Sequence, residues 1–531
     1  METLMVWWKK AVIYHIYPRS FQDSDDDGVG DLKGVRDRLN YLVWLGVDAI
    51  WLSPFYKSPM KDFGYDVSDY CDVDPLFGAI DCFDALLTEA HARGLRVILD
   101  FVPNHSSNQH PWFLSSRRSR DDPKRDWYIW RDPAPGGGPP NNWVSHFGGS
   151  GWTFDEETQQ YYYHAFLEEQ PDLNWRNLEV RNAMHNVLRF WLKRGVDGFR
   201  IDVASHLVKD AAFRDNPPNP NYDGRGPDIQ RLMQTYSSDR PEVQEIIAGL
   251  RHVVDEFGGD RLLIGELYLS LDRLVRYYGE GLRGLHLPFN FQLLDARWSA
   301  DDIRRVIEKY EAALPEGAWP NWVLSNHDRP RVAVRVGEVQ TPIAAMLVLT
   351  LRGTPTLYYG DEIGLGNVPV PPERTRDTWA LRESGPDVGR DPSRTPMQWD
   401  EGPFAGFSGR EPWLPLSPDH SSRNVSVMCE DKSSILLLVR ELLHYRRGHE
   451  ALERGAWRPL RSDDDVLAYE RVFGDERIAI LLNFSNEPRC VEGLGLDSAE
   501  IALSTHADRK GERAGEVVTL RPDEGLILER P

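Results

Sequence analysis

The chain has 531 residues, of which 62 are basic and 83 acidic, giving a formal net charge of -21. This length predicts two or three domains, and the acidic excess excludes nucleic acid and anionic membranes as partners, because both are polyanions. Four cysteines without metal-type spacing are too few for a disulfide framework. We expect them to be reduced thiols in a cytoplasmic protein: Cys71, Cys82, Cys429 and Cys490.

Residues 1–11 lack the continuous apolar core and the small-residue cleavage site of a secretory signal. No run approaches the ~20 apolar residues that are needed to span a bilayer. We therefore expect a cytoplasmic monomer or small homo-oligomer without a membrane partner, acting on a small neutral or cationic molecule.

Strand and helix patterns alternate along most of the chain, which predicts an α/β fold. Eight apolar runs suit buried strands, and eight such strands with intervening helices predict a (β/α)8 barrel. The predicted strands are 11–17, 49–52, 96–102, 198–202, 262–266, 285–291, 322–327 and 356–359, and the helical patterns include 32–45, 83–93 and 179–194.

Two further regions depart from this alternation. The long irregular stretch 103–174, with the Pro- and Gly-rich turn 133–140, predicts a subdomain or lid inserted after the third strand. A Pro- and Gly-rich stretch at 367–418 predicts a loop over the top of the barrel, followed by a helix at 432–447. Short alternating strands such as 465–472 and 477–483 predict an antiparallel β-domain. We therefore expect a barrel formed by 1–102 and 175–455, a lid at 103–174 and a C-terminal domain at 456–531.

Three acidic residues, Asp202, Glu266 and Asp328, stand at the ends of predicted strands. One strand-end carboxylate is more often a structural ion pair, but three in one parallel barrel indicate an active site. Arg200 is two residues before Asp202 and so faces the same side; we expect it to keep Asp202 ionised. Burial of Glu266 is expected to raise its pKa. One ionised and one protonated carboxyl group are the pair that cleaves a glycosidic bond.

His105 and His327 also follow predicted strands. Two histidines at strand ends of one barrel suit hydrogen bonds to substrate hydroxyls. Zinc is a weaker interpretation, because no His-x-x-x-His pair accompanies them.

Carboxylates at alternate positions precede a glycine in the segment 23–31, and oxygen ligands at this spacing suit Ca²⁺ or Mg²⁺. The segment is not an EF-hand, because Gly34 occupies the position of the bidentate Glu and a strand precedes it. The alternative is a solvated acidic turn.

Several motifs resemble the signature regions of the α-amylase clan of retaining glycoside hydrolases, family 13, in order and spacing over nearly the whole chain. They are Asp-Phe-Val-Pro-Asn-His at 100–105, Gly-Phe-Arg-Ile-Asp at 198–202, Gly-Glu at 265–266 and Asn-His-Asp at 326–328. Gln-Pro-Asp-Leu-Asn at 170–174 and the loop 391–399 are similar to features of its oligo-1,6-glucosidase and α-glucosidase branch.

The resemblance implies a role for each matching residue. Asp202 is similar to the nucleophile, Glu266 to the acid/base and Asp328 to the third carboxylate. The acidic loop resembles the branch's structural metal loop. The implied sugar-binding residues are Asp62, Tyr65, His105, Phe166, Arg200, His327 and Arg390, and the implied metal ligands are Asp23, Asp25, Asp27, Asp31 and the Val29 carbonyl. Arg394 is interpreted as a solvated loop charge.

The expected function is that of an exo-acting retaining α-glucosidase, which releases terminal α-glucose from short maltose-, isomaltose- or sucrose-like oligosaccharides. The alternatives are a transglucosylase or sugar isomerase on the same scaffold, and a catalytically inactive transporter partner. Glu266-Leu267-Tyr268 departs from the Glu-Ala-Asn of trehalose synthases.

Linkage preference stays open at this point. Val203, directly after the nucleophile, resembles the oligo-1,6-glucosidase branch and favours 1,6 activity alongside 1,4. However, Ala204-Ser205-His206 departs from the Ile-Asn that follows in isomaltases.

Overall fold

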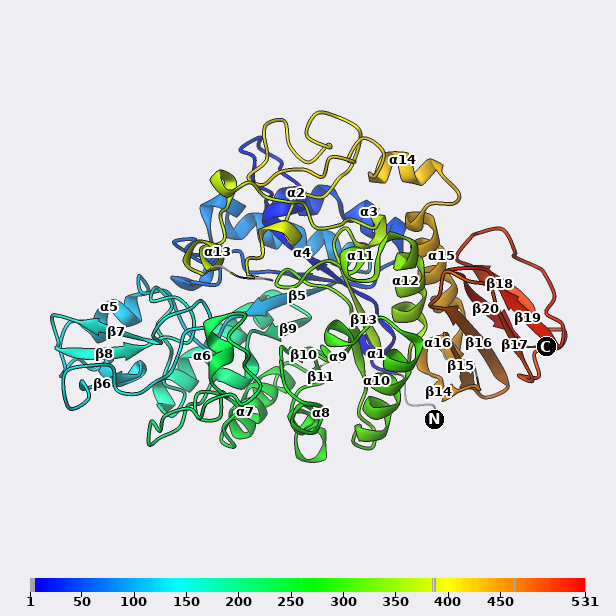
Figure 1. Cartoon of the computed structure of the whole chain (residues 1–531). Coiled ribbons are helices and arrows are strands. Elements are labelled where there is room, and N and C mark those ends of the chain that lie inside the picture. The colour runs from blue at the N-terminus through cyan, green and yellow to red at the C-terminus, as the bar shows by residue number, and fades with distance from the viewer. Residues whose placement is uncertain (1–4, 259, 384, 386–387, 462–464, 531) are drawn as a thin grey trace.

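The computed structural model describes residues 5–258, 260–383, 385, 388–461 and 465–530. Parts of the predicted N-terminal segment (1–4) and of the predicted C-terminal domain (462–464 and 531) lie outside the described residues. Figure 1 shows a central barrel with a small subdomain on one side and a β-domain on the opposite side.

Eight parallel strands form the central sheet, in the order β11-β10-β9-β5-β2-β1-β13-β12. One apolar cluster joins side chains of both end strands, such as Leu287 and Val323, to Ile13 and Ile98 from the middle of the order. The sheet is therefore a (β/α)8 barrel, as predicted. Its strands are β1 (Ile13–Ile16), β2 (Ala49–Leu52), β5 (Arg96–Phe101), β9 (Gly198–Ile201), β10 (Leu262–Gly265), β11 (Leu287–Pro288), β12 (Asn321–Val323) and β13 (Thr354–Tyr358).

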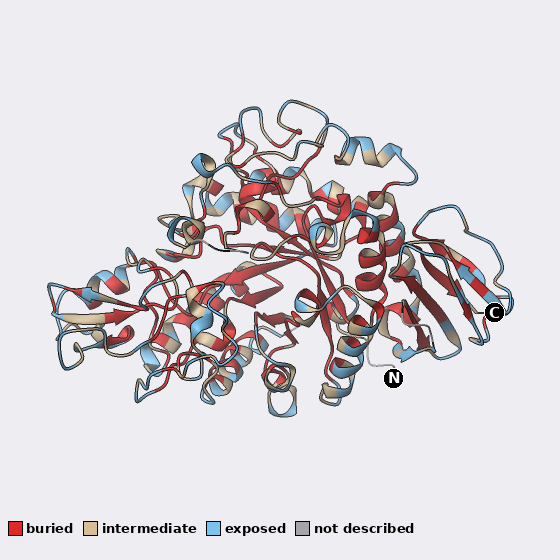
Figure 2. Cartoon of the chain, in the orientation of Figure 1, coloured by how far each residue is buried: buried red, intermediate tan, exposed pale blue. Residues whose placement is uncertain are grey.

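The barrel strands are almost entirely buried (Figure 2), because the sheet packs on itself inside and on helices outside. This is why their sequences are continuous apolar runs. Asn177 caps α6 by accepting a hydrogen bond from the Glu179 N–H at 2.8 Å, and Gly195 ends it at φ 108°,. The longer barrel helices are α4 (Ile80–Ala92), α6 (Leu178–Arg194), α7 (Val243–Asp255), α10 (Ala300–Ala313) and α12 (Thr341–Thr350).

Three predicted elements differ clearly in the structure, and one of them is the expected strand 322–327, which shortens to β12. The expected helix 32–45 is broken at Arg38 into α2 (Leu32–Asp37) and α3 (Leu39–Leu45), where the Arg38 guanidinium bonds Gln22 at 2.6 Å and lies 4.1 Å above the Trp399 ring. The expected strand 285–291 shortens to β11, because Pro288 lacks an N–H for the ladder,.

The inserted region contains α5 (Pro111–Arg117) and a three-stranded sheet in the order β6-β8-β7 (Trp130–Arg131, Gln160–Tyr163, Trp152–Asp155). Its apolar cluster includes Trp143 and Trp152, and Phe213 and Tyr236 pack against that cluster from the loop after β9. The lid is therefore built from two segments of the chain, of which the sequence indicated one.

Several short strands and helices lie outside the barrel sheet. A two-stranded sheet, β3 (Tyr56–Lys57) and β4 (Asp69–Val73), follows β2. No helix within the described residues is long and apolar enough to cross a bilayer. The remaining short helices are α1 (Trp7–Lys10), α8 (Leu271–Leu274), α9 (Gln292–Asp295), α11 (Val332–Val336), α13 (Thr378–Arg382), α14 (Val425–Glu430) and α16 (Glu450–Arg454).

The C-terminal domain is an antiparallel β-domain, as predicted. One sheet has the order β14-β15-β16-β20-β18 and a second pairs β17 with β19. Their facing side chains share an apolar cluster that includes Leu481, Val518 and Leu528. The strands are β14 (Ala456–Pro459), β15 (Val466–Phe473), β16 (Glu476–Asn483), β17 (Arg489–Glu492), β18 (Glu500–Ser504), β19 (Val517–Leu520) and β20 (Gly525–Glu529).

Helix α15 (Ile435–Gly448) joins the two domains and carries a buried arginine. Arg446 donates to the carbonyls of Leu349 at 2.8 Å, Leu351 at 3.3 Å and Gly353 at 2.7 Å. These carbonyls lie at and just beyond the C-terminus of α12, where helix carbonyls lack partners within the helix. Arg446 therefore caps the helix that leads into β13.

We predict that Arg446→Met lowers the free energy of unfolding by about 3 kcal/mol, because it keeps most of the stem but leaves buried carbonyls unpaired at ~1–3 kcal/mol each. Urea denaturation followed by circular dichroism measures the change. The neighbouring, half-exposed Arg447, which pairs with Asp48 at 2.8 Å, is the control, and Arg447→Met should cost less than ~1 kcal/mol. Equal losses would contradict the capping role.

Candidate active site

A cavity of about 920 Å³ opens at the C-terminal ends of the barrel strands, the face on which barrel enzymes carry their active sites. Lid residues and the loop after β13 also line it. Of the sequence-predicted catalytic and sugar-binding residues, Arg200 alone lies beneath the lining. The others all contribute to it: Asp62, Tyr65, His105, Phe166, Asp202, Val203, Glu266, His327, Asp328 and Arg390.

Arg200, on β9, is the centre of the cavity floor. Its Nη1 donates to Asp100 Oδ1 at 2.8 Å and to Asp202 Oδ1 at 2.7 Å, and its Nη2 lies 2.8 Å from Glu266 Oε2. Arg200 is 1% exposed. One buried guanidinium therefore serves carboxylates at the ends of three neighbouring strands, β5, β9 and β10. Asp100 was not assigned a role from the sequence, although it begins the first signature motif.

The protonation of this cluster follows from its charge count. Burial raises the pKa of Asp202 well above its usual range and that of Glu266 also upward, while Arg200 opposes both shifts. The predicted pairing of Arg200 with Asp202 is confirmed, but the guanidinium is shared with Asp100 and Glu266. Three buried carboxyl groups that face one cation favour keeping one proton among them.

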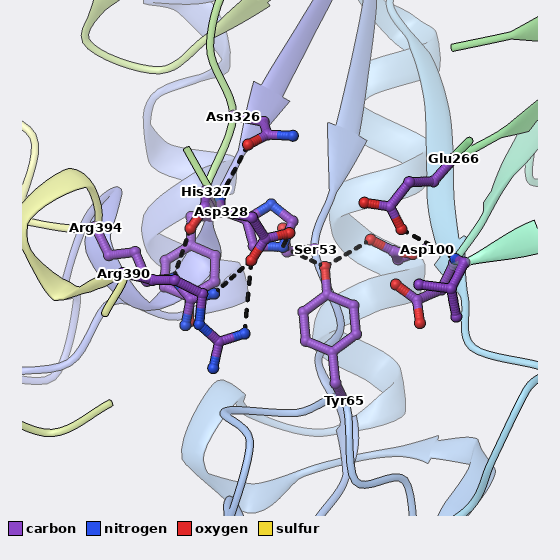
Figure 3. A network of polar contacts seen from close by, with 12 residues as sticks. Ser53, Tyr65, Asp100, Glu266, Asn326, His327, Asp328, Arg390 and Arg394 are labelled. Carbon is purple, nitrogen blue, oxygen red and sulfur yellow. Dashed lines mark hydrogen bonds and ion pairs between the residues drawn. The ribbon is translucent and has the colours of Figure 1, made fainter. Parts of the chain in front are cut away.

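Tyr65 links this cluster to the other side of the cavity. Its hydroxyl donates to Asp100 Oδ2 at 3.0 Å and lies 2.7 Å from His327 Nε2, and its ring stacks on His327 at 5.4 Å. Figure 3 shows the Tyr65 hydroxyl between Asp100 and His327. Burial lowers the pKa of His327 well below its usual value, so the imidazole is neutral and available for hydrogen bonds.

Asp328 faces two arginines from the loop after β13 (Figure 3). Arg394 Nη2 donates to Asp328 Oδ1 at 2.9 Å, and Arg390 Nη1 lies 3.5 Å from the same oxygen. Burial acts to raise the pKa of Asp328, but Arg394 and Arg390 outweigh it and the net shift is downward. The two arginines therefore favour the ionised form of Asp328.

The interpretation of Arg394 as a solvated loop charge is wrong. Its side chain is fully buried, and its Nε donates to the His327 carbonyl at 2.7 Å. The expected contact of Arg390 is confirmed, since its Nη2 donates to Asp62 Oδ1 at 2.7 Å and to Asp377 Oδ1 at 2.7 Å. Both arginines belong to one Pro-rich loop, whose composition gave no sign of burial.

Val203 has a left-handed backbone, with φ 37° and ψ 50°, a conformation that a β-branched residue rarely adopts. Its N–H donates to Glu266 Oε2 at 2.9 Å, and the next N–H, of Ala204, donates to the Glu266 carbonyl at 3.1 Å. The strained turn after β9 therefore holds the carboxyl group at the end of β10.

The lid is tied to the barrel through the Gln-Pro-Asp-Leu-Asn motif. Asp172 accepts hydrogen bonds from Ala165 N–H at 2.7 Å and Asn104 Nδ2 at 3.0 Å, and forms a buried ion pair with Lys209. Gln170 Nε2 lies 3.1 Å from both Asp62 Oδ2 and His105 Nε2. This motif thus positions two of the predicted sugar-binding residues, a role that its resemblance alone did not specify.

Two histidines outside the predicted set also line the cavity, beside Phe166. His146 comes from the inserted region, and His206 follows Val203. Burial lowers the pKa of His146 to about 4 and that of His206 well below its usual value, so both rings are neutral. The sequence singled out His206 as a departure from isomaltases but did not indicate His146.

The acidic loop brings three of its predicted ligands together. Ligand oxygens of Asp23, Asp25 and Asp27 lie within 4.8 Å of one another. Burial and the neighbouring carboxylates raise the pKa of Asp25, which is the repulsion that a bound cation relieves. Asp31 caps α2 instead, accepting hydrogen bonds from Gly34 N–H at 2.8 Å and Ser24 Oγ at 2.9 Å.

Comparison with known proteins agrees with this geometry. Residues 15–455 match the alpha-amylase catalytic-domain family, and the chain belongs to this family of glycoside hydrolases. It is 42% identical over 496 residues to a probable alpha-glucosidase of Rhizobium meliloti (strain 1021), with 91% of this chain and 90% of that protein covered. It is 37% identical over 565 residues to the oligo-1,6-glucosidase of Parageobacillus thermoglucosidasius, with 99% of each covered.

A solved structure extends the likeness to three dimensions. The crystal structure of the alpha-glucosyl transfer enzyme XgtA superposes with a TM-score of 0.94 at 39% identity, covering 99% of this chain and 100% of that one. The resemblance to the α-glucosidase and oligo-1,6-glucosidase branch is thereby confirmed.

Proposed function

We propose that this protein is an exo-acting retaining α-glucosidase that releases terminal α-glucose from short α-linked oligosaccharides. The observation that carries the proposal is the cluster of Asp202 and Glu266 around Arg200, with the ionised Asp328 across the same cavity. We assign the proton of this cluster to Glu266 and leave Asp202 ionised in its 2.7 Å contact with Arg200; one ionised and one protonated carboxyl group are what glycosidic cleavage requires. The intact carboxylates also disfavour a catalytically inactive transporter partner.

In the first step, Asp202 attacks the anomeric carbon while Glu266 gives its proton to the leaving oxygen. This forms a glucosyl ester on Asp202 and releases the shortened sugar. Glu266, now a carboxylate, removes a proton from water, and the resulting hydroxide oxygen displaces Asp202. The shared guanidinium of Arg200 stabilises whichever carboxylate is charged at each step, and two inversions at the same carbon return α-glucose.

The residues opposite the nucleophile hold the terminal glucose. Asp328 and Asp62 present oxygens to the sugar hydroxyls, and Arg390 fixes both carboxylates from above. The Tyr65 ring, stacked on His327, supplies an apolar face,. Lid residues such as His146 and Phe166 wall this end of the cavity, so it admits a chain end rather than a chain interior.

Linkage is governed by the leaving-sugar side of the cavity. Val203 lines the cavity directly after Asp202, with a branched apolar side chain that narrows the approach of a ring linked without a methylene. A 1,6 link has an extra rotatable bond, so we propose 1,6 activity alongside 1,4. Shape differences of this kind are worth ~1–3 kcal/mol.

Transglucosylation is a second candidate, favoured by the superposition on an alpha-glucosyl transfer enzyme. The chemistry is shared up to the glucosyl ester, after which a sugar hydroxyl replaces water. The test is to incubate the enzyme with maltose, isomaltose, sucrose, maltotriose and starch and to resolve the products by chromatography and NMR. We expect α-glucose as the first product from short substrates and almost none from starch. Rapid viscosity loss of starch, or β-glucose as the first product, would contradict the proposal.

We predict that Asp202→Asn lowers kcat more than about 10³-fold on all substrates, because the covalent nucleophile is lost. Glu266→Gln should lose ~10²–10⁴-fold on maltose but form the glucosyl ester readily from aryl glucosides, whose leaving group needs no proton. Stopped-flow release of the aryl alcohol measures this step. The control is Asp255→Asn, which changes a carboxylate on the outer helix α7 and should leave kcat unchanged. Equal losses on both substrate types would overturn the role of Glu266.

We propose that Asp23, Asp25 and Asp27 hold a structural Ca²⁺ or Mg²⁺ with the Val29 carbonyl, while Asp31 supports the loop through its hydrogen bonds to Ser24 and Gly34. Hard cations prefer such oxygen ligands. Asp23 also accepts a hydrogen bond from Ser408 Oγ at 2.6 Å, so the ion would fasten the acidic loop to the chain beyond the active-site arginines.

We predict that dialysis against EDTA lowers the melting temperature and that added Ca²⁺ restores it, since the ion binds the folded state. Asp25→Asn should melt at the EDTA value and respond to neither treatment. An unchanged melting temperature, together with no metal by elemental analysis, would return the loop to a plain acidic turn.

We further propose a cytoplasmic location and a monomer or small homo-oligomer. The four cysteines are free thiols, as is usual in a reducing compartment.

A further inference from the structure

Two histidines from distant parts of the chain meet in the cavity wall with their nitrogens facing. His146 Nε2 lies 3.1 Å from His206 Nε2, the ring centroids are 5.0 Å apart, and the ring planes are inclined by 66°. Both rings line the same cavity as Asp202 and Val203. The mechanism proposed above gives neither ring a chemical role, and His146 serves there only as part of the cavity wall.

Each histidine is held in place from outside the pair. The His146 ring stacks on Phe166 at 4.9 Å, and the backbone N–H of His146 donates to the Ala165 carbonyl at 2.8 Å. The carbonyl of His206 accepts a hydrogen bond from Lys209, which is itself paired with Asp172. Among the described residues, each Nε2 contacts only the other Nε2 within hydrogen-bond distance. The pair is therefore pre-organised.

We propose that His146 and His206 form a binding site for a divalent transition metal ion such as Cu²⁺ or Zn²⁺. Two imidazole nitrogens that share a tetrahedral ion at ~2.0–2.1 Å lie about 3.3 Å apart, close to the observed 3.1 Å. Neutral imidazoles suit these ions, with Cu²⁺ bound most tightly. They do not suit Ca²⁺, so the site is distinct from the acidic loop.

Both histidines can bind the ion as neutral imidazoles, so metal binding requires no loss of a proton from the pair. His206 Nδ1 lies 3.3 Å from Ser205 Oγ, so a proton on Nδ1 leaves Nε2 free as a ligand. His146, whose Nε2–H then donates to His206, moves its proton to Nδ1 as the metal binds. Two protein ligands leave the remaining coordination positions to water from the cavity.

Metal binding has a consequence for activity, which rests on the proposed function. His146 belongs to the inserted region and His206 to the loop after β9, so an ion shared by both joins the lid to the barrel. The ion and its waters would occupy part of the cavity that also holds Asp202 and that a sugar needs. The metal should therefore inhibit competitively, raising KM without lowering kcat.

The site itself is tested without activity. CuCl2 is added to the full-length protein in a non-chelating buffer, and pulsed EPR counts the imidazole ligands while titration gives the Kd. We expect two imidazoles in the wild type and at least a tenfold weaker Kd in His146→Gln and in His206→Gln. His185→Gln, on the outer helix α6, is the matched control and should bind as the wild type does. A wild-type Kd in either cavity variant would overturn the site.

Inhibition tests the placement separately. ZnCl2 should raise the KM of the wild type for an aryl glucoside and should have at least tenfold less effect on His146→Gln and His206→Gln. Because EPR needs no turnover, a protein that binds Cu²⁺ as expected but cleaves no glucoside would contradict the proposed function and leave the metal site standing. Purely non-competitive inhibition would overturn the placement of the ion in the sugar cavity.

Discussion

The buried guanidinium of Arg200 is the constraint around which this site is built. It brings Asp100, Asp202 and Glu266 from three successive strands into contact with one positive charge. A buried carboxylate without a partner would be costly, so each of the three depends on Arg200 to remain in place. Because one cation cannot neutralise three anions, the cluster keeps a proton, and a proton that can leave and return is what an acid/base residue needs. The same contact thus supports the fold of the barrel floor and its chemistry.

A second set of charges faces the first across the cavity and comes from far along the chain. Arg390 and Arg394 lie in the loop after β13, yet they bond Asp62, which follows β2, and Asp328, which follows β12. Contacts between loops that follow different strands therefore close the cavity. This is typical of barrel enzymes, whose active sites are built from the loops at the C-terminal ends of the strands. Asp328 stays ionised here because two arginines serve it, whereas Asp202 and Glu266 share one.

Much of this could be predicted from the sequence, and the reasons for the failures are physical. The strand-end residues Asp202, Glu266 and Asp328 were identifiable because buried parallel strands are continuous apolar runs that stop at a polar group. The role of Arg394 could not be identified from the sequence. A loop of prolines, glycines and charged residues has the composition of a solvated segment whether or not it is buried. His146 was missed for a similar reason: its partner, His206, is 60 positions away, and a pair from two loops has no spacing signal. The break at Arg38 depends on Trp399, a contact that no local pattern carries.

In the proposed reaction Asp202 becomes covalently attached to glucose while Arg200 holds it in place. Trapping with 5-fluoro-α-glucosyl fluoride, followed by proteolysis and mass spectrometry of the labelled peptide, measures this most directly. We expect one fluoroglucosyl group on Asp202, and no label on Glu266 or Asp328. A label on either of those residues, or turnover of the reagent without any covalent species in a protein that still cleaves glucosides, would contradict the role of Asp202.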